Sequence, residues 1–539
     1  MALTKVTYSM INGASVNVLD YGAKGNGTDD DRAAILAALT ALPNGGTVVF
    51  PPGTYLVSAQ INVPYGNVRL QGYDYNASVI KIANNYANNT QLFRCDSVDM
   101  LTFADLGFDG NLANQNIVST ADNKQIAILF VGTSSFGTVQ RCYFKDWGKD
   151  GVYVGTVNNK RIIVSECRFQ NIRRIGVTVI AGDQIHVINN QFYDGEYQTN
   201  VVFNNGVHYE PNSAADTLRG LIVVGNSFAN MQGGIMLFNN NGATCSGIII
   251  EGNNFDRITE RGAVVAYALG TGGVTIQGNR FRSCGKSATS GVDTNGCIAA
   301  SATSNAIITN NSFETCTGFY GTISLENSGS RGAQIKNNLF LSDKRRGIYL
   351  GYAFGSNSSG SLRQITGNVM LGGGQDAANT YPAIEIANTA SHEGNGDILT
   401  GNSIQISTAS GYNTGILIDY DSSTSIVGQN TIIGSTGTKY GFTNGTPTLL
   451  WDYSRDVAAT IDPTSLADGA GETIDVTVSG AAIGDQVLFS PGVNVQGMLV
   501  SATVKSTGTV QLRIQNETGS GPIDLASSTW KFKTIRPII

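Results

Sequence analysis

Apolar and polar residues alternate in short runs along most of the chain. Runs such as GVYV (151–154), GVTV (176–179), GIYL (347–350) and AIEIA (383–387) place an apolar residue at every second position. Alternation with a period of two, rich in β-branched residues, predicts half-buried β-strands. No period of 3.6 residues persists between these runs, so the pattern predicts connections without helices.

A second motif recurs beside these strands and closes on a large apolar residue, most often Phe. The closing residues recur at intervals of 23 to 36 residues. They are Phe108, Phe144, Phe169, Phe192, Phe228, Phe255, Phe281, Phe313, Phe340, Met370, Ile404 and Ile432. A fixed motif at variable spacing predicts the coils of a solenoid with loops of changing length, and strands stacked without helices predict a parallel β-helix.

An asparagine stands two places before the closing residue in most of these repeats. The set is Asn190, Asn226, Asn253, Asn279, Asn311, Asn338, Asn368, Asn402 and Asn430. Asn tolerates left-handed backbone geometry and can hydrogen-bond its own turn, so the pattern predicts an amide ladder at one corner. The Phe residues predict an interior aromatic stack. Cys142 and Cys167 occupy the Asn position in their repeats and are expected to pack there.

The two ends of the chain depart from the repeat. Residues 28–42 predict a helix with Thr28 or Asp29 as N-cap, which would cover the open end of the solenoid. Alternating strands near the C-terminus predict a small antiparallel β-sandwich. The expected organisation is a stub (1–14), an opening segment with the capping helix (15–60), a parallel β-helix (61–452) and a sandwich for trimerisation or carbohydrate binding (453–539).

Composition narrows the function classes. Charged residues make up 14% of the chain and the net charge is −6, which disfavours a nucleic-acid partner. No apolar run approaches the roughly 18 residues of a membrane span, and the first residues do not resemble a secretory signal. The seven Cys form no C-x-x-C pair and the three His are far apart in sequence, so neither a metal nor another cofactor is expected. The cysteine pattern also predicts that the chain folds in a reducing cytoplasm.

Two segments near the N-terminus resemble a known family. VNVLDYGAKGNGTDDDRAAILAAL (16–39) and GGTVVFPPGTYLVS (45–58) are similar to the opening of pectate-lyase-like, right-handed parallel β-helix proteins, which include pectinases, epimerases and bacteriophage tailspike depolymerases. The first residues resemble tailspikes in particular. The tail, residues 459–527, resembles a C-terminal β-sandwich of phage tail proteins.

The resemblance implies an all-β protein acting on the virion tail at the bacterial surface. It implies a homotrimer, in contact with other tail proteins, that binds and cleaves bacterial surface polysaccharide. Tailspikes of this kind usually carry a virion-attachment domain before the opening segment, which only about 14 residues precede here. We therefore expect either a truncated chain or attachment through another protein.

The chemistry is expected on one outward sheet face, between the inward apolar residues. The predicted outward residues are Tyr153, Thr178, His208, Glu210, Met236, Phe238, Val264, Ala299, Ser301, Ser324, Glu326, Tyr349, Glu385, Leu417, Asp419 and Asp421. Glu326 and Glu385 are two coils apart, which places their backbones roughly 9–10 Å apart. Flexible side chains could bring these carboxyls into the range of an inverting glycoside hydrolase. Met236, Phe238 and Tyr349 could supply apolar platforms for sugar rings.

Two further groups carry candidate chemistry. Asp343, Arg345 and Arg346 lie in a predicted turn and could supply an acid or an anion clamp, or form only a solvated turn or a subunit contact. His208 and Glu210 share a strand face, with Asp194 and Glu196 in the preceding turn. An acid on an outward strand position is more often a contribution to solubility than a catalyst.

The leading hypothesis is hydrolysis of a capsular or O-antigen polysaccharide by Glu326 and Glu385. Asp343, His208 and Glu210 are the other catalytic candidates. The first alternative is β-elimination on a uronate-containing capsule, with His208 and Arg219, or Tyr349 and Arg345, as the active groups. The second is a receptor-binding spike without catalysis, because a fold does not fix a function.

Overall fold

The computed structural model describes most of the 539 residues. The described ranges are 14–116, 125–156, 159–195, 204–285, 296–318, 320–326, 331–351, 362–376, 380–387, 397–407, 411–419, 426–434, 438–442, 448–450, 457–478 and 481–535. They form two compact units: residues 1–398 with 403–424 and 432–446, and a second unit of 447–539 with the short segments 399–402 and 425–431.

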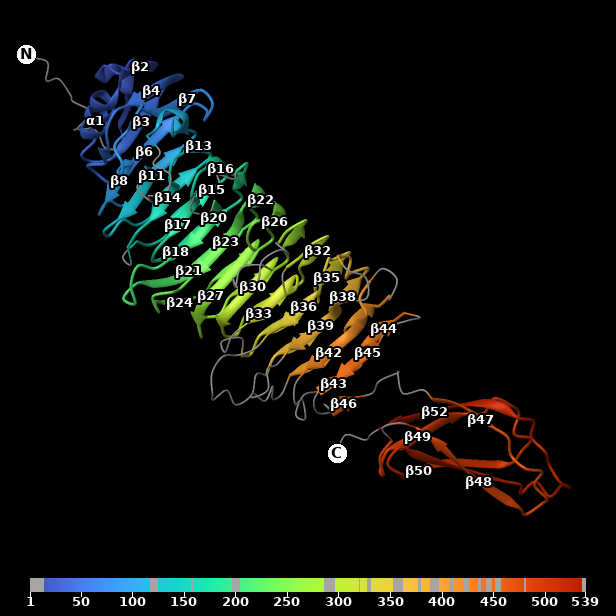
Figure 1. The fold of residues 1–539 in the computed structure, drawn as a ribbon. Helices are drawn as coiled ribbons and strands as arrows, with labels where there is room; N and C mark the ends of the chain where they lie inside the picture. Colours follow the sequence, from blue (N-terminus) through green and yellow to red (C-terminus); the bar gives the residue numbers. More distant parts are fainter. Residues whose placement is uncertain are drawn as a thin grey trace, which may run out of the picture. The chain divides into compact units, whose positions relative to one another are not determined.

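Three long parallel sheets make a right-handed β-helix (Figure 1). Sheet A contains β1 (Ala14–Asn17), β3 (Gly46–Phe50), β6 (Val68–Gly72), β9 (Thr102–Ala104), β12 (Thr138–Gln140), β15 (Ile163–Ser165), β18 (Gly182–Ile188), β21 (Thr217–Val224), β24 (Thr244–Ser246), β25 (Ile249–Glu251), β28 (Thr275–Gln277), β31 (Ile307–Thr309), β34 (Gln334–Lys336), β37 (Gln364–Thr366), β40 (Ile398–Thr400), β43 (Ile426–Gly428) and β46 (Thr448–Leu450).

Sheet B follows sheet A in each coil. It contains β2 (Asn26–Asp30), β4 (Gly53–Val57), β7 (Ser78–Ile82), β10 (Gly107–Asp109), β13 (Tyr143–Trp147), β16 (Arg168–Ile172), β19 (Gln191–Tyr193), β22 (Ser227–Met231), β26 (Asn254–Ile258), β29 (Arg280–Arg282), β32 (Ser312–Glu314), β35 (Leu339–Leu341), β38 (Val369–Leu371), β41 (Ser403–Gln405) and β44 (Thr431–Ile433).

Sheet C completes the coil. It contains β5 (Ile61–Asn62), β8 (Gln91–Asp96), β11 (Ile126–Val131), β14 (Asp150–Val154), β17 (Ile175–Val179), β20 (Asn205–Tyr209), β23 (Gly233–Phe238), β27 (Val264–Gly270), β30 (Ile298–Thr303), β33 (Ile323–Glu326), β36 (Ile348–Leu350), β39 (Pro382–Ala387), β42 (Thr414–Asp419) and β45 (Thr438–Phe442). The predicted fold class, an all-β parallel β-helix, is confirmed.

The Phe residues form the predicted interior stack along sheet B. From Phe108 to Phe340 the rings are nearly parallel, with neighbouring centroids 4.7–4.9 Å apart. This distance matches the spacing of parallel strands, so each ring rests on the ring of the next coil.

The Asn residues form the predicted ladder at the corner where sheet A turns into sheet B. From Asn190 to Asn368, each side-chain Nδ2 donates to Oδ1 of the next ladder Asn, as the Asn190–Asn226 and Asn253–Asn279 bonds of 3.0 Å illustrate. The left-handed residue of the turn is the one before the ladder Asn, for example Gly225 with φ 69°. Cys167 occupies the ladder as predicted, where its backbone N–H donates to Asn190 Oδ1 at 2.8 Å.

Helix α1 begins later than predicted, at Arg32–Thr40. Residues Asn26–Asp30 form strand β2 instead of the first turn, and Asp31 is the N-cap residue. The carboxylate of Asp31 does not cap the helix, because it accepts hydrogen bonds from the backbone N–H groups of Lys24 and Gly25. Two short 3₁₀ helices, η2 (Val18–Tyr21) and η3 (Leu112–Asn114), complete the helical content of the described residues.

The C-terminal strands form the predicted antiparallel sandwich. One sheet contains β47 (Val457–Ile461), β49 (Gln486–Ser490) and β52 (Ser528–Ile535), and the other contains β48 (Gly471–Thr477), β50 (Leu499–Ser506) and β51 (Thr509–Gln515). Trp530, Phe532 and Leu512 are buried between them.

Candidate active site on the outward face of sheet C

One column of outward side chains runs the length of sheet C. Its members are Arg94, Leu129, Tyr153, Thr178, His208, Met236, Val265, Ala299, Ser324, Tyr349, Glu385 and Leu417. Among the described residues, the predicted outward positions agree with this register except at one strand, and Asp421 lies outside the described residues. Val264 pairs with the inward Ile235 and Ile298, and Val265 points outward in its place.

Outward position does not mean exposure on this sheet. Met236, Val265 and Ala299 are buried and form a small hydrophobic cluster of their own, with Phe238 packed against it. Met236 has no exposed surface, so the prediction that it offers a platform for a sugar ring is wrong for this conformation. Phe238 keeps part of its surface accessible.

His208 lies almost completely buried at the edge of this hydrophobic cluster. Its ring meets the ring of Phe238 edge-on, with centroids 5.7 Å apart. Burial first, and then the charges of Arg174 and Arg261, lower the pKa of His208 to about 3. The imidazole is therefore neutral at neutral pH. Its Nδ1 lies 3.8 Å from Oε2 of Glu210, whose side chain is half exposed.

Arg174 and Asp150 complete this group, and sequence reasoning missed both. Arg174 Nε donates to Asp150 Oδ1 at 2.9 Å, and Arg174 Nη2 lies 3.9 Å from Glu210 Oε2. Asp150 is fully buried and also accepts a hydrogen bond from Thr178 at 3.0 Å. An acidic residue directly before the apolar GVYV run was the available signal for Asp150.

Two residues that the sequence placed with His208, Asp194 and Arg219, do not join it. Asp194 follows the last strand residue of β19 on sheet B, Tyr193, and Arg219 lies on β21 of sheet A. Glu196 lies outside the described residues. Arg174 and Arg261 supply the positive charge that Arg219 was expected to supply.

A second group lies farther along the same face, around Glu385. Arg346 Nε forms an ion pair with Glu385 Oε2, and its guanidinium lies 5.5 Å from the ring centroid of Tyr349 and 5.3 Å from that of Tyr381. Tyr349 stacks on Tyr320 at 4.9 Å. The structure thus brings together three residues that the sequence predicted as parts of one site: Glu385, Arg346 and Tyr349.

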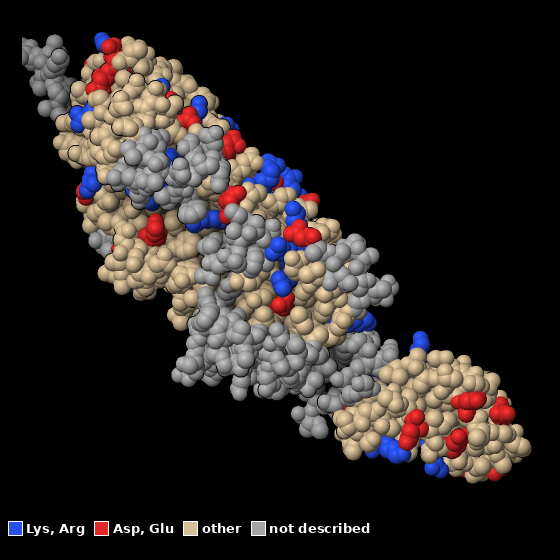
Figure 2. Space-filling model, viewed as in Figure 1, with Lys and Arg blue, Asp and Glu red and all other residues tan. Residues whose placement is uncertain are grey.

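Arg345 belongs to the same group. It forms an ion pair with Asp376 at 3.4 Å and lies 5.5 Å above the ring of Tyr381. Figure 2 shows how few Lys, Arg, Asp and Glu side chains interrupt the neutral surface on the face in view. A concentration of two arginines, two carboxylates and three tyrosines is therefore unusual for this protein.

Glu326 is less well placed relative to Glu385 than the sequence suggested. Glu326 pairs with Ser301, whereas Ser324 stands in the column of Glu385. The two glutamates are separated by two coils and by two residues along the strand, which puts their backbones roughly 12 Å apart instead of 9–10 Å. The side chain of Glu326 lies outside the described residues.

Asp343 is inside the β-helix, which corrects its predicted place in a solvated turn. It is fully buried, and burial raises its pKa to about 8, an effect that the neighbouring Thr322 reduces only in part. Residues at the equivalent corner position of earlier coils are apolar or thiol groups, such as Ile258 and Cys316. Asp343 is therefore neutral at neutral pH and has no contact with the surface.

The described residues contain no group of three or more His, Cys, Asp or Glu side chains arranged to hold a metal ion. In the same part of the chain, none of the helices is both long and apolar enough to cross a membrane. The seven cysteines are buried free thiols.

The three sheets define the chain as a right-handed parallel β-helix. Residues 15–255 match the family described as rhamnogalacturonase A/epimerase, pectate lyase-like. The tailspike protein of Escherichia coli bacteriophage HK620, solved with a pentasaccharide, aligns with 97% of this chain and 94% of its own, with a TM-score of 0.62 and 14% identity. The predicted resemblance to pectate-lyase-like proteins is confirmed over residues 15–255, and the structural likeness shows that the chain shares the parallel β-helix fold of this tailspike.

Shorter matches relate the chain to curated enzymes. Mannuronan C5-epimerase AlgE6 of Azotobacter vinelandii is 40% identical over 110 residues, which is 18% of this chain and 13% of the epimerase. Alginate lyase 7 of the same organism is 36% identical over 110 residues, and a probable glucan endo-1,3-beta-glucosidase of Arthroderma benhamiae is 40% identical over 81 residues. The chain spans 13% or less of the length of each of these three relatives.

Proposed function

We propose that this protein is a tailspike-like depolymerase that binds and cleaves a bacterial capsular or O-antigen polysaccharide on the outward face of sheet C. One observation carries the proposal: Arg346, paired with Glu385, lies within 5.5 Å of the ring centroids of Tyr381 and of Tyr349, which stacks on Tyr320. Aromatic faces beside a fixed carboxylate suit a sugar ring, because its apolar face can stack while its polar edge is hydrogen-bonded. The polysaccharide-processing relatives support the same substrate class.

The reaction that we favour is glycoside hydrolysis with Glu385 and Glu326 as the two carboxyl groups. The ion pair with Arg346 fixes the position of the Glu385 carboxyl group, which suits it to the role of a general base that activates water. Glu326 would then protonate the leaving oxygen. The wide separation of the two strand positions fits an inverting enzyme, which needs room for a water molecule.

The test is to compare Glu385→Gln and Glu326→Gln with the wild-type protein. Each change should lower the release of reducing ends from capsule by about 10²–10⁴-fold, because a general acid or base contributes that factor. Glu314→Gln is the matched control, since Glu314 is a partly exposed acid on sheet B that pairs with Arg280. Turnover near the wild-type rate in both variants, with unchanged melting temperatures, would remove this pair from consideration.

β-Elimination on a uronate-containing polysaccharide is the second candidate. The neutral His208 beside Arg174 and Glu210 favours it, because elimination needs a base and a cation that steadies the enolate. Tyr349 with Arg345 remains the other pair for this reaction. A rise in ultraviolet absorbance from unsaturated products, lost in His208→Gln and kept in Glu385→Gln, would establish elimination at His208.

The assembly and location belong to the same proposal. We expect a homotrimer on the virion tail, in contact with other tail proteins, with the C-terminal sandwich contributing to trimerisation or carbohydrate binding. Analytical ultracentrifugation of the purified protein should give three chain masses, and a single chain mass would contradict the trimer. A trimer that binds capsule without releasing any product would be a receptor-binding spike.

A further inference from the structure

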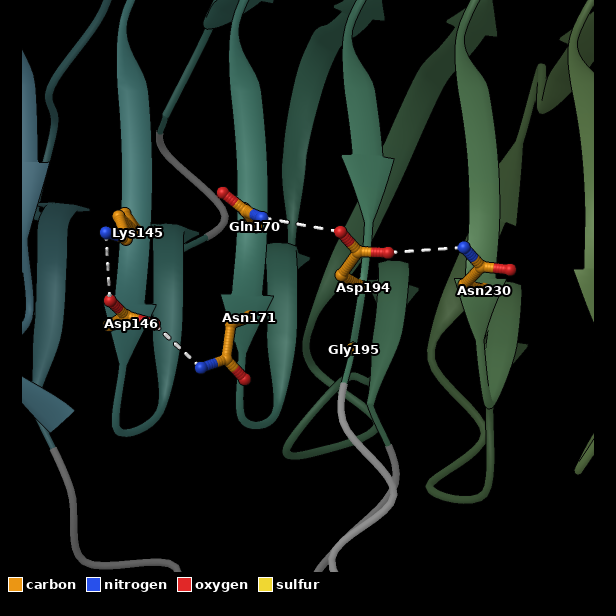
Figure 3. Close-up of a pocket in the computed structure, with 7 residues that line it drawn as sticks. All are labelled: Lys145, Asp146, Gln170, Asn171, Asp194, Gly195 and Asn230. Atoms are coloured by element: carbon orange, nitrogen blue, oxygen red, sulfur yellow. Dashed lines mark hydrogen bonds and ion pairs between the residues drawn. The ribbon is translucent and has the colours of Figure 1, made fainter. Parts of the chain in front are cut away.

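The outward surface of sheet B carries a hollow that takes no part in the site on sheet C. Its volume is about 470 Å³, and Lys145, Asp146, Gln170, Asn171, Asp194 and Asn230 line it. Figure 3 shows these side chains on β13, β16 and β22 and at Asp194, directly after β19. They lie at the edge where the chain leaves sheet B for sheet C.

Backbone geometry explains only part of this composition. Asp146, Asn171, Asp194 and Asn230 all have a positive φ, between 51° and 57°. Asp and Asn tolerate this conformation better than other side-chain-bearing residues, so the turn favours them. The turn does not require Lys145 or Gln170, which are ordinary strand residues pointing into the same hollow.

Hydrogen bonds hold the polar groups of the hollow in fixed directions. Asp194 accepts from Gln170 Nε2 at 3.3 Å and from Asn230 Nδ2 at 3.2 Å, and Asp146 accepts from Asn171 at 2.7 Å (Figure 3). Each carboxylate oxygen has two acceptor positions, so these carboxylates retain capacity for a hydroxyl donor. A row of oriented carboxylates and amides is suited to the paired hydroxyl groups of a sugar.

Tyrosine rings adjoin the hollow on the same face. Tyr143 is two residues before Lys145, and its hydroxyl is hydrogen-bonded to Gln170. Tyr75 meets Tyr143 edge-on at 5.8 Å, and the guanidinium of Arg168 lies 5.2 Å above the ring of Tyr75. Tyr193, the neighbour of Asp194, is also partly exposed.

The same sheet looks different a few coils later. Strands β26, β29, β32 and β35 carry no outward aromatic residue, and charged side chains of β26, β29 and β32 form ion pairs there. There Asp256 pairs with Arg257 and Arg282, and Glu314 pairs with Arg280. The combination of rings, amides and a hollow is therefore a local feature of the first half of sheet B.

We propose that this hollow is a second, non-catalytic saccharide-binding site for uncharged sugar residues. The tyrosines would stack on apolar ring faces, and Gln170, Asp194 and Asn230 would hydrogen-bond the hydroxyl groups. Lys145 is 3.6 Å from Asp146, so its charge is largely balanced and offers little to an anionic sugar. The proposal goes beyond the cleavage proposed for sheet C, because binding on sheet B needs no reaction.

The test begins with an array of purified neutral and acidic bacterial O-antigens and capsules, probed with the wild-type protein. The neutral polysaccharide that binds most strongly is then titrated by calorimetry against Gln170→Ala and Tyr143→Leu. Each variant should bind about fivefold more weakly, because one lost ring stack or hydrogen-bonding amide is worth roughly 1 kcal/mol. Arg280→Gln on β29 is the matched control and should bind as the wild type does.

Three results would overturn the proposal: no neutral polysaccharide binds, only acidic polysaccharides bind, or both variants bind as tightly as the control. Circular dichroism and melting temperature identify a variant that fails to fold, and the other variant then decides. Cleavage is measured in parallel to separate the two proposals. Loss of binding in the sheet B variants with no cleavage by any protein would reject the depolymerase and keep this site.

Discussion

The corner between sheets A and B and the outward face of sheet C are built on the same coils in opposite ways. At the corner one side chain repeats, so that Asn follows Asn and Phe follows Phe through successive coils. On the face of sheet C almost every coil differs, from His208 through Met236 to Tyr349 and Glu385. Repetition holds the coils in register, whereas variation produces particular sites on a uniform scaffold.

The largest loss of stability is expected from a substitution in the middle of the Phe stack. Phe255→Ala removes a fully buried ring that contacts the rings of Phe228 and Phe281, and should lower the free energy of unfolding by about 3–5 kcal/mol. Denaturant titration measures the change. Phe238→Ala, on the varied face and only partly buried, should cost clearly less, and equal losses would abolish the distinction between the two regions.

The amide ladder should give the next largest effect. Asn279→Ala leaves the backbone N–H of Asn253 without its acceptor and removes the amide bond to the carbonyl of Ile250. A buried donor without a partner costs roughly 1–3 kcal/mol. Thermal unfolding should show a drop of several degrees. Asn254→Ala is the matched control, since Asn254 is an exposed residue of the neighbouring strand, and a comparable drop there would argue against the ladder.

Asp343 breaks the repetition at another corner, and its removal should stabilise the protein. Burial raises its pKa to about 8, so the folded state holds a proton that the unfolded state loses above about pH 4. Wild-type stability therefore falls as the pH rises from 4 to 8. Asp343→Asn should melt a few degrees above the wild type at pH 8, with a smaller difference at pH 5. A constant difference across this range would contradict the assignment of a buried neutral carboxyl.

The smallest change in stability is expected at His208, and its dependence on pH is opposite to that of Asp343. Its pKa of about 3 means that the unfolded chain binds a proton below about pH 6.5 while the folded chain does not. Wild-type stability from this group is complete above pH 6.5 and is lost as the pH falls towards 3. His208→Gln should therefore lose less stability on acidification than the wild type does, as melting curves at pH 7 and pH 4.5 would reveal.

The repeating part of the molecule could be predicted from the sequence because it is local and redundant. Most coils carry a Phe or an Asn at the repeated positions, so the pattern can be recognised despite an irregular coil such as that of Cys142. The register of Glu385 and Tyr349 followed from the same alternation. The start of helix α1 was misplaced because Asp31 hydrogen-bonds the backbone at Lys24 and Gly25, which the spacing of capping residues does not reveal.

The site could be predicted only in part, because its burial and pairing depend on contacts between coils. The pattern marked Met236 as outward but could not indicate that Val265 and Ala299 would bury it. Arg174 and Asp150 are joined by the stacking of two coils, so neither is conspicuous in its own segment. Asp343 looked like a surface acid because acids are rarely buried, and its interior position is an exception to that rule.

The amide ladder gives the β-helix a direction of growth. Every bond between ladder Asn residues from Asn190 to Asn368 runs the same way. The earlier Asn donates through both its backbone N–H and its side-chain Nδ2, and the later Asn accepts through Oδ1. A partly formed β-helix therefore ends in a pair of unsatisfied donors, which the acceptor of the next coil satisfies as it settles. Because a ribosome releases the chain from the N-terminus, each folded coil presents these donors to the coil that is synthesised after it. The β-helix can therefore fold one coil at a time from its N-terminal end.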